Sequence, residues 1–121
     1  MATVMVVDDS KTVRNYHGSI LKSMGLEVIE AENGMEALEK SLDRSVALYL
    51  VDVNMPIMDG YSFVADLRKQ KSHATVPVIM ITTQAKEEDK VQAYEVGANL
   101  FETKPIKPDL LQAYVQILVN K

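Results

Sequence analysis

Cysteine is absent from this 121-residue sequence, which excludes a disulfide framework and a thiolate metal site. No apolar run approaches the ~18 residues of a membrane-spanning helix. A charged leader followed by a long apolar stretch is also missing, so we expect no signal peptide, no membrane insertion and a cytoplasmic location. Basic residues are not in excess, because 13 Lys and Arg stand against 17 Asp and Glu. The formal net charge of −4 argues against nucleic-acid binding, which usually needs a basic surface.

What the sequence does contain is typical of a globular protein, with 47% hydrophobic and 25% charged residues. A chain of this length builds one proper core but not two. We therefore predict a single domain over residues 1–121, with no output domain in this chain.

Short hydrophobic runs alternate with helical patterns along the whole sequence. The runs rich in β-branched residues predict strands over 3–7, 26–31, 47–51, 76–81 and 99–103. Helical periodicity predicts helices over 11–24, from the Asn33-Gly34 turn onward, over 61–70, over 84–96 and after Pro108. On the second helix we expect a buried face of Met35, Leu38 and Leu42.

This alternation predicts βαβ units and therefore a parallel sheet. Five units with right-handed crossovers make a three-layer, doubly wound α/β domain, a (βα)5 fold. The run over 47–51 is apolar at every position, which indicates a central strand covered on both faces.

Polar side chains stand where four of the predicted strands end. Asp8 and Asp9 follow the first strand, Asp52 the third, Thr82 the fourth and Lys104 the fifth. Because the carboxyl ends of parallel strands share one edge of the sheet, we expect these side chains to lie together in a pocket.

The three acids of this pocket need a cation among them. Two unit charges ~4 Å apart repel by roughly 4 kcal/mol at an effective dielectric of 20. One lysine cannot neutralise three carboxylates, whereas a hard divalent cation can. An oxygen-only ligand set with no His or Cys nearby indicates Mg²⁺ or Mn²⁺.

A carboxylate, a divalent cation, a lysine and a hydroxyl are together the parts that phosphoryl transfer needs. Asp52 is the best candidate for the nucleophile, because it ends the central strand between the acidic pair and the Thr82–Lys104 side. A carboxylate nucleophile would give an aspartyl phosphate.

The motifs resemble those of the response regulator receiver domains, most closely the stand-alone, CheY-like chemotaxis type. The resemblance covers essentially the whole chain and implies a flavodoxin-like sheet of order 2-1-3-4-5. The motifs that carry it are Val6-Val7-Asp8-Asp9-Ser10, the run from Val51 to Pro56 with Asp59-Gly60, Ile81-Thr82, Gly97-Ala98 and Lys104-Pro105.

The resemblance implies a role for each acid. Asp52 would accept a phosphoryl group from the phosphohistidine of a histidine kinase. Asp9 and Asp52 would bind Mg²⁺ directly, Asp8 would act mainly through water, and Asn54 would offer its backbone carbonyl to the metal.

It also implies a switch. Lys104, which would precede a cis proline, would pair with the phosphoryl group, and Thr82 would move to hydrogen-bond it. Phe101 would then swing inward, although many chemotaxis members have a tyrosine at this position. As a plain alternative, Phe101 is a core residue of a short edge strand.

The resemblance places the output surface on the helix over 84–96, the strand over 99–103 and the last helix. A downstream protein would bind there, in chemotaxis or motility control, and the domain would be a monomer or a transient dimer. We expect exposed side chains on this surface at Lys86, Lys90, Tyr94 and Lys107.

Two other functions compete with this interpretation. A Mg²⁺-dependent phosphatase of the haloacid-dehalogenase pattern would need a second acid two residues after the nucleophile, where Asn54 stands. A receiver-shaped scaffold that is never phosphorylated is the other. We expect no enzyme with a separate substrate, and we interpret His17 and His73 as structural residues.

Overall fold

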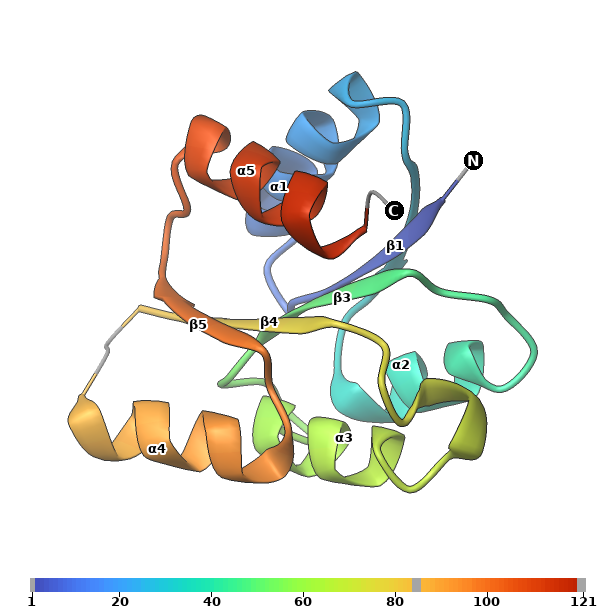
Figure 1. The fold of residues 1–121 in the computed structure, drawn as a ribbon. Helices are drawn as coiled ribbons and strands as arrows, with labels where there is room; N and C mark the ends of the chain where they lie inside the picture. Colours follow the sequence, from blue (N-terminus) through green and yellow to red (C-terminus); the bar gives the residue numbers. More distant parts are fainter. Residues whose placement is uncertain (1, 84–85, 120–121) are drawn as a thin grey trace.

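The computed structural model describes residues 2–83 and 86–119. Five parallel strands form one sheet of order β2-β1-β3-β4-β5 (Figure 1), so the predicted fold and strand order are confirmed. The strands are β1 (Thr3–Val7), β2 (Glu27–Ala31), β3 (Leu48–Asp52), β4 (Val78–Thr82) and β5 (Leu100–Thr103). The helices are α1 (Lys11–Ser23), α2 (Gly34–Ser41), α3 (Gly60–Leu67), α4 (Glu87–Val96) and α5 (Pro108–Leu118), with a short 3-10 turn, η1 (Lys71–His73).

Helices cover both faces of the sheet, with α1 and α5 on one side and α2, α3 and α4 on the other (Figure 1). Successive residues of a strand point to opposite faces, so each central strand feeds two cores. In β3, Leu48 and Leu50 pack in the core beneath α1 and α5, whereas Tyr49 and Val51 pack in the other. All five residues of β3 are buried, as the uninterrupted apolar run predicts.

The buried face of α2 differs from the prediction. Leu38 is partly buried and packs against the core, as predicted, but Met35 and Leu42 are 47% and 73% exposed. The helix buries Ala37 and Ser41 in their place. The helix is only eight residues long, so Leu42 falls at its C-cap beyond the last turn. Small residues form the contact because α2 lies close to its neighbours, and the hydrophobicity of Met35 and Leu42 therefore misled the prediction.

Several boundaries differ from the prediction by one to three residues; α3, for example, ends at Leu67 instead of about Gln70. Strand β4 begins at Val78, because Pro77 has no backbone N–H to donate to a ladder. Helix α4 begins at Glu87, and Gln84, where the sequence predicts its start, lies outside the described residues. Gly97 ends α4 with φ 112°, a left-handed conformation that glycine adopts at little cost. No helix within residues 2–83 and 86–119 is long and apolar enough to span a membrane.

A buried hydrogen-bond chain lies beneath the amino ends of the strands. The Nε2 of His73 faces the backbone carbonyl of Ser41 at 2.9 Å, and its Nδ1 lies 3.3 Å from the hydroxyl of Tyr49. A carbonyl only accepts, so Nε2 carries the proton and the Tyr49 hydroxyl donates to Nδ1. His73 is 3% exposed, so it is structural as predicted but buried instead of lying in a polar loop.

Replacing Tyr49 by Phe removes that donor and leaves a buried ring nitrogen without a partner. We expect the free energy of unfolding to fall by about 1–2 kcal/mol, measured by urea denaturation. The control is Tyr16→Phe, because the Tyr16 hydroxyl also donates to a carbonyl, that of Ile106, but from a half-exposed ring. Equal losses in the two variants would contradict a special contribution from the buried chain.

Candidate functional site

The carboxyl edge of the sheet gathers the polar residues that end the strands. Asp52 and Thr82 are the last residues of β3 and β4, and Lys104 follows β5 directly. The parallel register aligns these ends, pairing Val7 with Val51 and Thr82 with Thr103. One rim is therefore shared by five residues that lie at, or just after, the carboxyl ends of strands of the same sheet: Asp8, Asp9, Asp52, Thr82 and Lys104.

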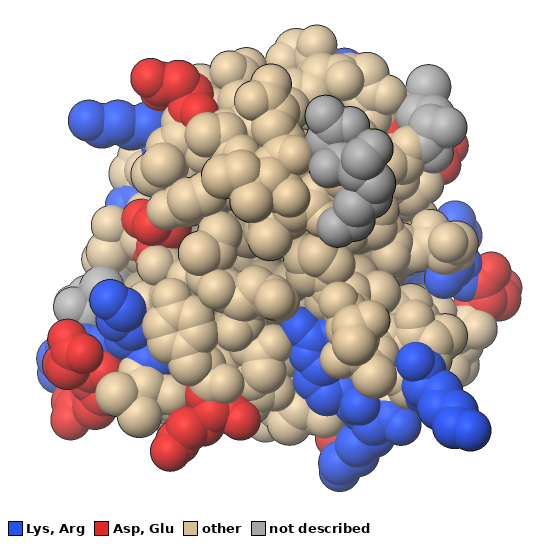
Figure 2. Space-filling view, viewed as in Figure 1, with Lys and Arg blue, Asp and Glu red and all other residues tan. Residues whose placement is uncertain are grey.

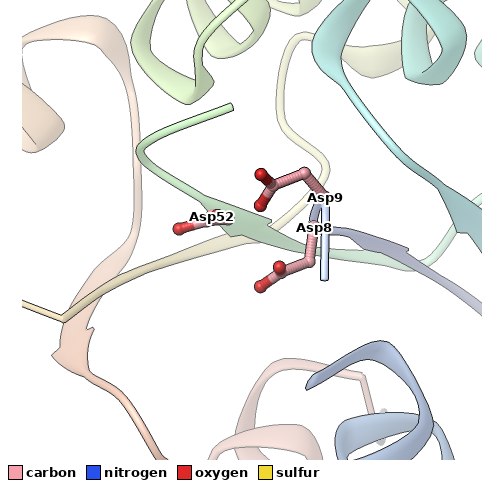
Figure 3. A group of neighbouring side chains, drawn as sticks. All are labelled: Asp8, Asp9 and Asp52. Carbon is pink, nitrogen blue, oxygen red and sulfur yellow. The ribbon is translucent and has the colours of Figure 1, made fainter. Parts of the chain in front are cut away.

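The three acids lie around a common space (Figure 3). One carboxylate oxygen from each of Asp8, Asp9 and Asp52 lies within 4.8 Å of the other two. The ammonium of Lys104 bridges two of them, with its Nζ 2.9 Å from Asp8 Oδ2 and 3.1 Å from Asp52 Oδ1. Lys104 is joined to Pro105 by a cis peptide bond, as the family resemblance implies.

Burial differs sharply between the three carboxylates. Asp8 is fully buried and Asp52 is 3% exposed, whereas Asp9 is exposed. Oδ1 of Asp8 accepts a hydrogen bond from the Ser10 backbone at 2.9 Å, and its Oδ2 faces Lys104. Asp8 is therefore held by the Ser10 backbone and by its ion pair with Lys104.

Electrostatics in the pocket oppose a charged Asp52. Burial, and next the negative charge of Asp8, raise the pKa of Asp52 to about 6 from an ordinary 3.8. Lys104 and a hydrogen bond from the Asn54 backbone act in the opposite direction but do not cancel this rise. Burial alone would lower the pKa of Lys104, yet Asp8 and Asp52 outweigh it and raise that pKa. The pocket is thus short of positive charge despite its lysine.

The donor set fits a hard divalent cation. Three carboxylates converge, and Mg²⁺ prefers oxygen ligands at about 2.0–2.1 Å while retaining several waters. Opposite ligands of such an ion lie ~4.2 Å apart, so carboxylate oxygens within 4.8 Å need only small side-chain rotations to bind one. The described residues therefore offer an acidic pocket suited to Mg²⁺ or Mn²⁺.

The remaining predicted residues are Thr82, Asn54 and Phe101. Thr82 is 3% exposed at the end of β4, and Asn54 is an exposed residue two positions after Asp52. Both line a polar cavity of about 270 Å³ with Tyr61. Phe101 is 8% exposed and packs in the core on the side of α3 and α4. This packing suits the plain alternative of a core phenylalanine and leaves the switch role a prediction.

Arg14 and His17, two buried residues of α1, lie near the acidic pocket, and neither was predicted to belong to it. Arg14 donates from Nη1 to the backbone carbonyl of Asp8 at 2.7 Å and from Nε to Glu30 at 2.8 Å. His17 is fully buried, and neither ring nitrogen has a hydrogen-bond partner among the described residues. Burial lowers the pKa of His17 to about 4 against the attraction of Asp8, with Lys104 adding to the decrease.

Both residues have a signal in the sequence. Positions 14, 17, 18 and 21 follow the i, i+3, i+4, i+7 spacing of one helix face, and these are the buried residues of α1. A charged residue within such a face needs a buried partner, so Arg14 could have been assigned to the acidic pocket.

Comparison with known proteins agrees with this geometry. The family model of the response regulator receiver domain matches residues 4–116. Protein PilG of Pseudomonas aeruginosa is 39% identical over 111 residues, which are 91% of this chain and 82% of PilG. The sensor histidine kinase CheAY of Helicobacter pylori is 36% identical over 115 residues, 93% of this chain, but the match spans only 14% of CheAY.

Solved structures agree as well. The chemotaxis protein CheY4 of Vibrio cholerae superposes with a TM-score of 0.92 at 36% identity, covering 98% of both chains. The receiver domain of the sensor histidine kinase PA1611 from Pseudomonas aeruginosa PAO1, which holds a magnesium ion in its active-site cleft, gives 0.91 at 26% identity. That match covers 99% of this chain and 98% of the PA1611 domain. Matched over nearly its whole length, the chain belongs to the response regulator receiver domain family and is a phosphorelay signalling module.

Proposed function

We propose that Asp52 is the phosphoacceptor and that its donor is the phosphohistidine of a histidine kinase. The observation that carries the proposal is the Lys104 ammonium held between Asp8 and Asp52, with Asp9 within 4.8 Å on the open side. Asp52 ends the central strand beside Lys104, whereas Asp8 is fully buried and Asp9 is exposed, which supports Asp52 as the acceptor.

In the transfer, a carboxylate oxygen of Asp52 attacks the phosphorus in line with the leaving group. A P–O bond to Asp52 forms as the P–N bond to the donor imidazole breaks, and the electron pair of that bond returns to the ring nitrogen. Lys104, already at 3.1 Å from Asp52, stabilises the charge on the phosphoryl oxygens. Thr82 is the last residue of the neighbouring strand β4, and its hydroxyl hydrogen-bonds the phosphoryl group.

Asp9 and Asp52 would hold Mg²⁺ directly, with the Asn54 carbonyl as a further ligand and Asp8 acting through water. When bound, the cation supplies positive charge against the phosphoryl oxygens. The PA1611 receiver domain, with magnesium in its cleft, supports this assignment. Arg14 holds the backbone of Asp8 in place, so it is a positioning residue for the acid pair.

The output surface that we propose is formed by α4, β5 and α5. Figure 2 views this side, where uncharged side chains cover the middle and charged ones gather mainly along α4 and the lower rim. Lys86, Lys90, Tyr94 and Lys107 are exposed, as predicted. A groove of about 360 Å³ between α4 and β5 includes Phe101, whose inward movement would link this face to the phosphorylation site. A downstream protein would bind here, and CheY4 as a structural relative supports an output in chemotaxis.

The competing functions have less support. The comparisons favour a signalling receiver over a classical enzyme, and Asn54 occupies the position where the phosphatase pattern needs an acid. Burial raises the pKa of Asp52, so a charged carboxylate at this position is unfavourable. A scaffold that is never phosphorylated would not need that carboxylate. We therefore propose that the chain turns over no separate substrate.

Labelling by acetyl phosphate tests the assignment. With Mg²⁺ present, we expect one phosphoryl group per chain by intact mass, and none in Asp52→Asn or after chelation by EDTA. The control is Asp59→Asn, because Asp59 caps α3 at an exposed position and Asn caps equally well. Labelling that survives in Asp52→Asn, or that does not need the metal, would refute the proposal.

A further inference from the structure

Two fully buried residues, Asp8 and His17, keep polar atoms without hydrogen bonds. Over residues 2–83 and 86–119, the buried side-chain nitrogens and oxygens that lack a hydrogen-bond partner are Asp8 Oδ2 and both ring nitrogens of His17. Such atoms have left water without a replacement partner, which costs free energy, so they are uncommon in native proteins. The two residues are complementary, because a carboxylate oxygen accepts a hydrogen bond and an imidazole N–H donates one.

The carboxylate of Asp8 points toward helix α1. Val4 and Val6 of β1 pack in the core beneath α1 and α5, and residues two apart in a strand face the same side. Asp8 continues this alternation directly after the strand. Figure 3 shows its carboxylate on the side of α1, opposite to that of Asp9. The Asp8 carboxylate therefore lies on the face of the sheet that α1 covers.

His17 lies on the buried face of α1, near the end of β1. The helix runs back along β1, so Arg14 near its start donates to the backbone carbonyl of Asp8 at 2.7 Å, whereas Leu21 packs deeper in the core. His17 follows Arg14 by three residues on the same face, about 4.5 Å along the helix axis. The His17 ring is thus close to the carboxyl end of β1, where Asp8 begins the acidic pocket.

Lys104 lies near the same ring. The hydroxyl of Tyr16, the neighbour of His17, donates at 2.9 Å to the carbonyl of Ile106, two residues after Lys104. Burial lowers the pKa of His17 to about 4, and two charges reach the ring: that of Asp8 raises this pKa and that of Lys104 lowers it. The imidazole is therefore neutral at neutral pH and carries one N–H that can donate.

Lys104 holds Asp8 Oδ2 mainly by charge. Its Nζ lies 2.9 Å from that oxygen, but no hydrogen bond of good geometry reaches the oxygen from the described residues. In the proposed function Lys104 pairs with the phosphoryl group on Asp52, so its attraction for Asp8 is then shared. A buried carboxylate that loses its cation partner is strongly destabilised. An N–H donor beside it would offset this loss.

We propose that His17 is a positioning residue for Asp8, whose carboxylate accepts a hydrogen bond from the His17 ring when Lys104 turns to the phosphoryl group. The inference rests on the proposed function and deepens it, because it says what holds Asp8 once Asp52 is phosphorylated. His17 itself touches neither the phosphoryl group nor the metal. An apolar residue would fill the same buried position without the cost of burying an imidazole, so this role accounts for a histidine there.

The test measures binding of a phosphoryl mimic to matched variants. His17→Leu removes both ring nitrogens, whereas His17→Asn and His17→Gln each keep an amide N–H, near the positions of Nδ1 and Nε2. Beryllofluoride with Mg²⁺ imitates the phosphoryl group on Asp52. We expect His17→Leu to bind beryllofluoride about tenfold more weakly than the wild type, the loss of one charge-assisted hydrogen bond. One of the two amide variants should restore most of the affinity.

Two further measurements separate this role from a structural one. Mg²⁺ alone should bind His17→Leu as tightly as the wild type, because Lys104 stays beside Asp8 until the phosphoryl group is present. In EDTA, His17→Leu should melt a few degrees higher, because an unpartnered imidazole leaves the core. The control is Leu21→Val, fully buried about one turn farther along α1, which should melt lower yet bind beryllofluoride normally.

Equal beryllofluoride affinity in the wild type and His17→Leu would overturn the inference. So would a tenfold loss of Mg²⁺ binding or a lower melting temperature in His17→Leu, equal weakening in Leu21→Val, or failure of both amide variants to restore affinity. A wild-type chain that does not bind beryllofluoride with Mg²⁺, or that binds it equally well as Asp52→Asn, would instead refute the proposed function.

Discussion

Replacing Asp52 by Asn is expected to stabilise the metal-free protein by about 2 kcal/mol at pH 8 while abolishing labelling. Burial and the charge of Asp8 raise the pKa of Asp52 to about 6, so the folded state is penalised for holding this carboxylate charged. Asn removes the charge, and its oxygen can still accept a hydrogen bond from Lys104. The proposed acceptor therefore costs stability, as functional residues commonly do.

The stability gain of Asp52→Asn over the wild type grows as pH rises. A raised pKa means that the folded state binds the proton more tightly than the unfolded chain, whose Asp titrates near 3.8. The Asp52 carboxyl thus lowers the stability of the wild type as pH rises from about 4 to 6. Below pH 4 residue 52 is neutral in both proteins, so the stability gain of Asp52→Asn vanishes. Above pH 6 this gain reaches its full value.

Urea denaturation of the two proteins at pH 4, 6 and 8 in EDTA measures this gain. Adding Mg²⁺ should stabilise the wild type more than Asp52→Asn, because the ion binds the folded site and the variant lacks one ligand. The Asp59→Asn control should show neither effect. A variant less stable than the wild type at pH 8, or a difference independent of pH, would contradict the electrostatic account of the pocket.

The sheet edge could be predicted from the sequence because each polar residue follows an apolar run. Asp8, Asp52, Thr82 and Lys104 need only a parallel sheet to meet, and the alternation of strands with helices supplies it. The distances between these side chains could not be predicted. They depend on side-chain rotamers and on where the Lys104 ammonium lies between the carboxylates of Asp8 and Asp52.

Contacts of the helices were less predictable. Hydrophobicity alone predicted that the side chains of Met35 and Leu42 would be buried. The buried residues are instead Ala37 and Ser41, which are small enough for α2 to lie close to its neighbours. Arg14 is polar yet 8% exposed, since its guanidinium donates to the Asp8 carbonyl after β1 and to the Glu30 side chain within β2. The helix spacing indicates that Arg14 is buried and needs a partner, but which groups it meets is fixed by tertiary structure.

The turn at Ile57 escaped prediction for a related reason. The sequence from Asn54 to Gly60 indicates a loop through Pro56 and the Asp59-Gly60 pair, and the structure confirms one. Its left-handed residue would ordinarily be assigned to a glycine or asparagine. Ile57 adopts φ 70° instead, and the hydrogen bond from Gly34 to Met58 ties this loop to the start of α2, a segment that only the fold brings near.

Gly60→Ala is expected to be the most damaging small substitution at this site. A Cβ at position 60 would lie 2.3 Å from the backbone oxygen of Asp52, 2.9 Å from Met80 Cε and 3.0 Å from Val53 Cα. Two of these three atoms belong to backbone, so the clash cannot be relieved by rotating a side chain. We expect a loss of about 3 kcal/mol or more in the free energy of unfolding, because a core strand and α3 must separate.

The separation of β3 from α3 in Gly60→Ala should also displace Asp52, because the backbone carbonyl of Asp52 is the atom closest to the new methyl group. Labelling by acetyl phosphate should therefore slow in the fraction that remains folded, which circular dichroism quantifies at the assay temperature. Gly18→Ala is the matched control: its Cβ would meet only Val28 Cγ1 at 3.8 Å, an ordinary contact within α1. Alanine there should stabilise by about 0.5–1 kcal/mol and leave labelling unchanged. If Gly60→Ala labels at the wild-type rate, the close packing of α3 against the Asp52 backbone does not position the acceptor.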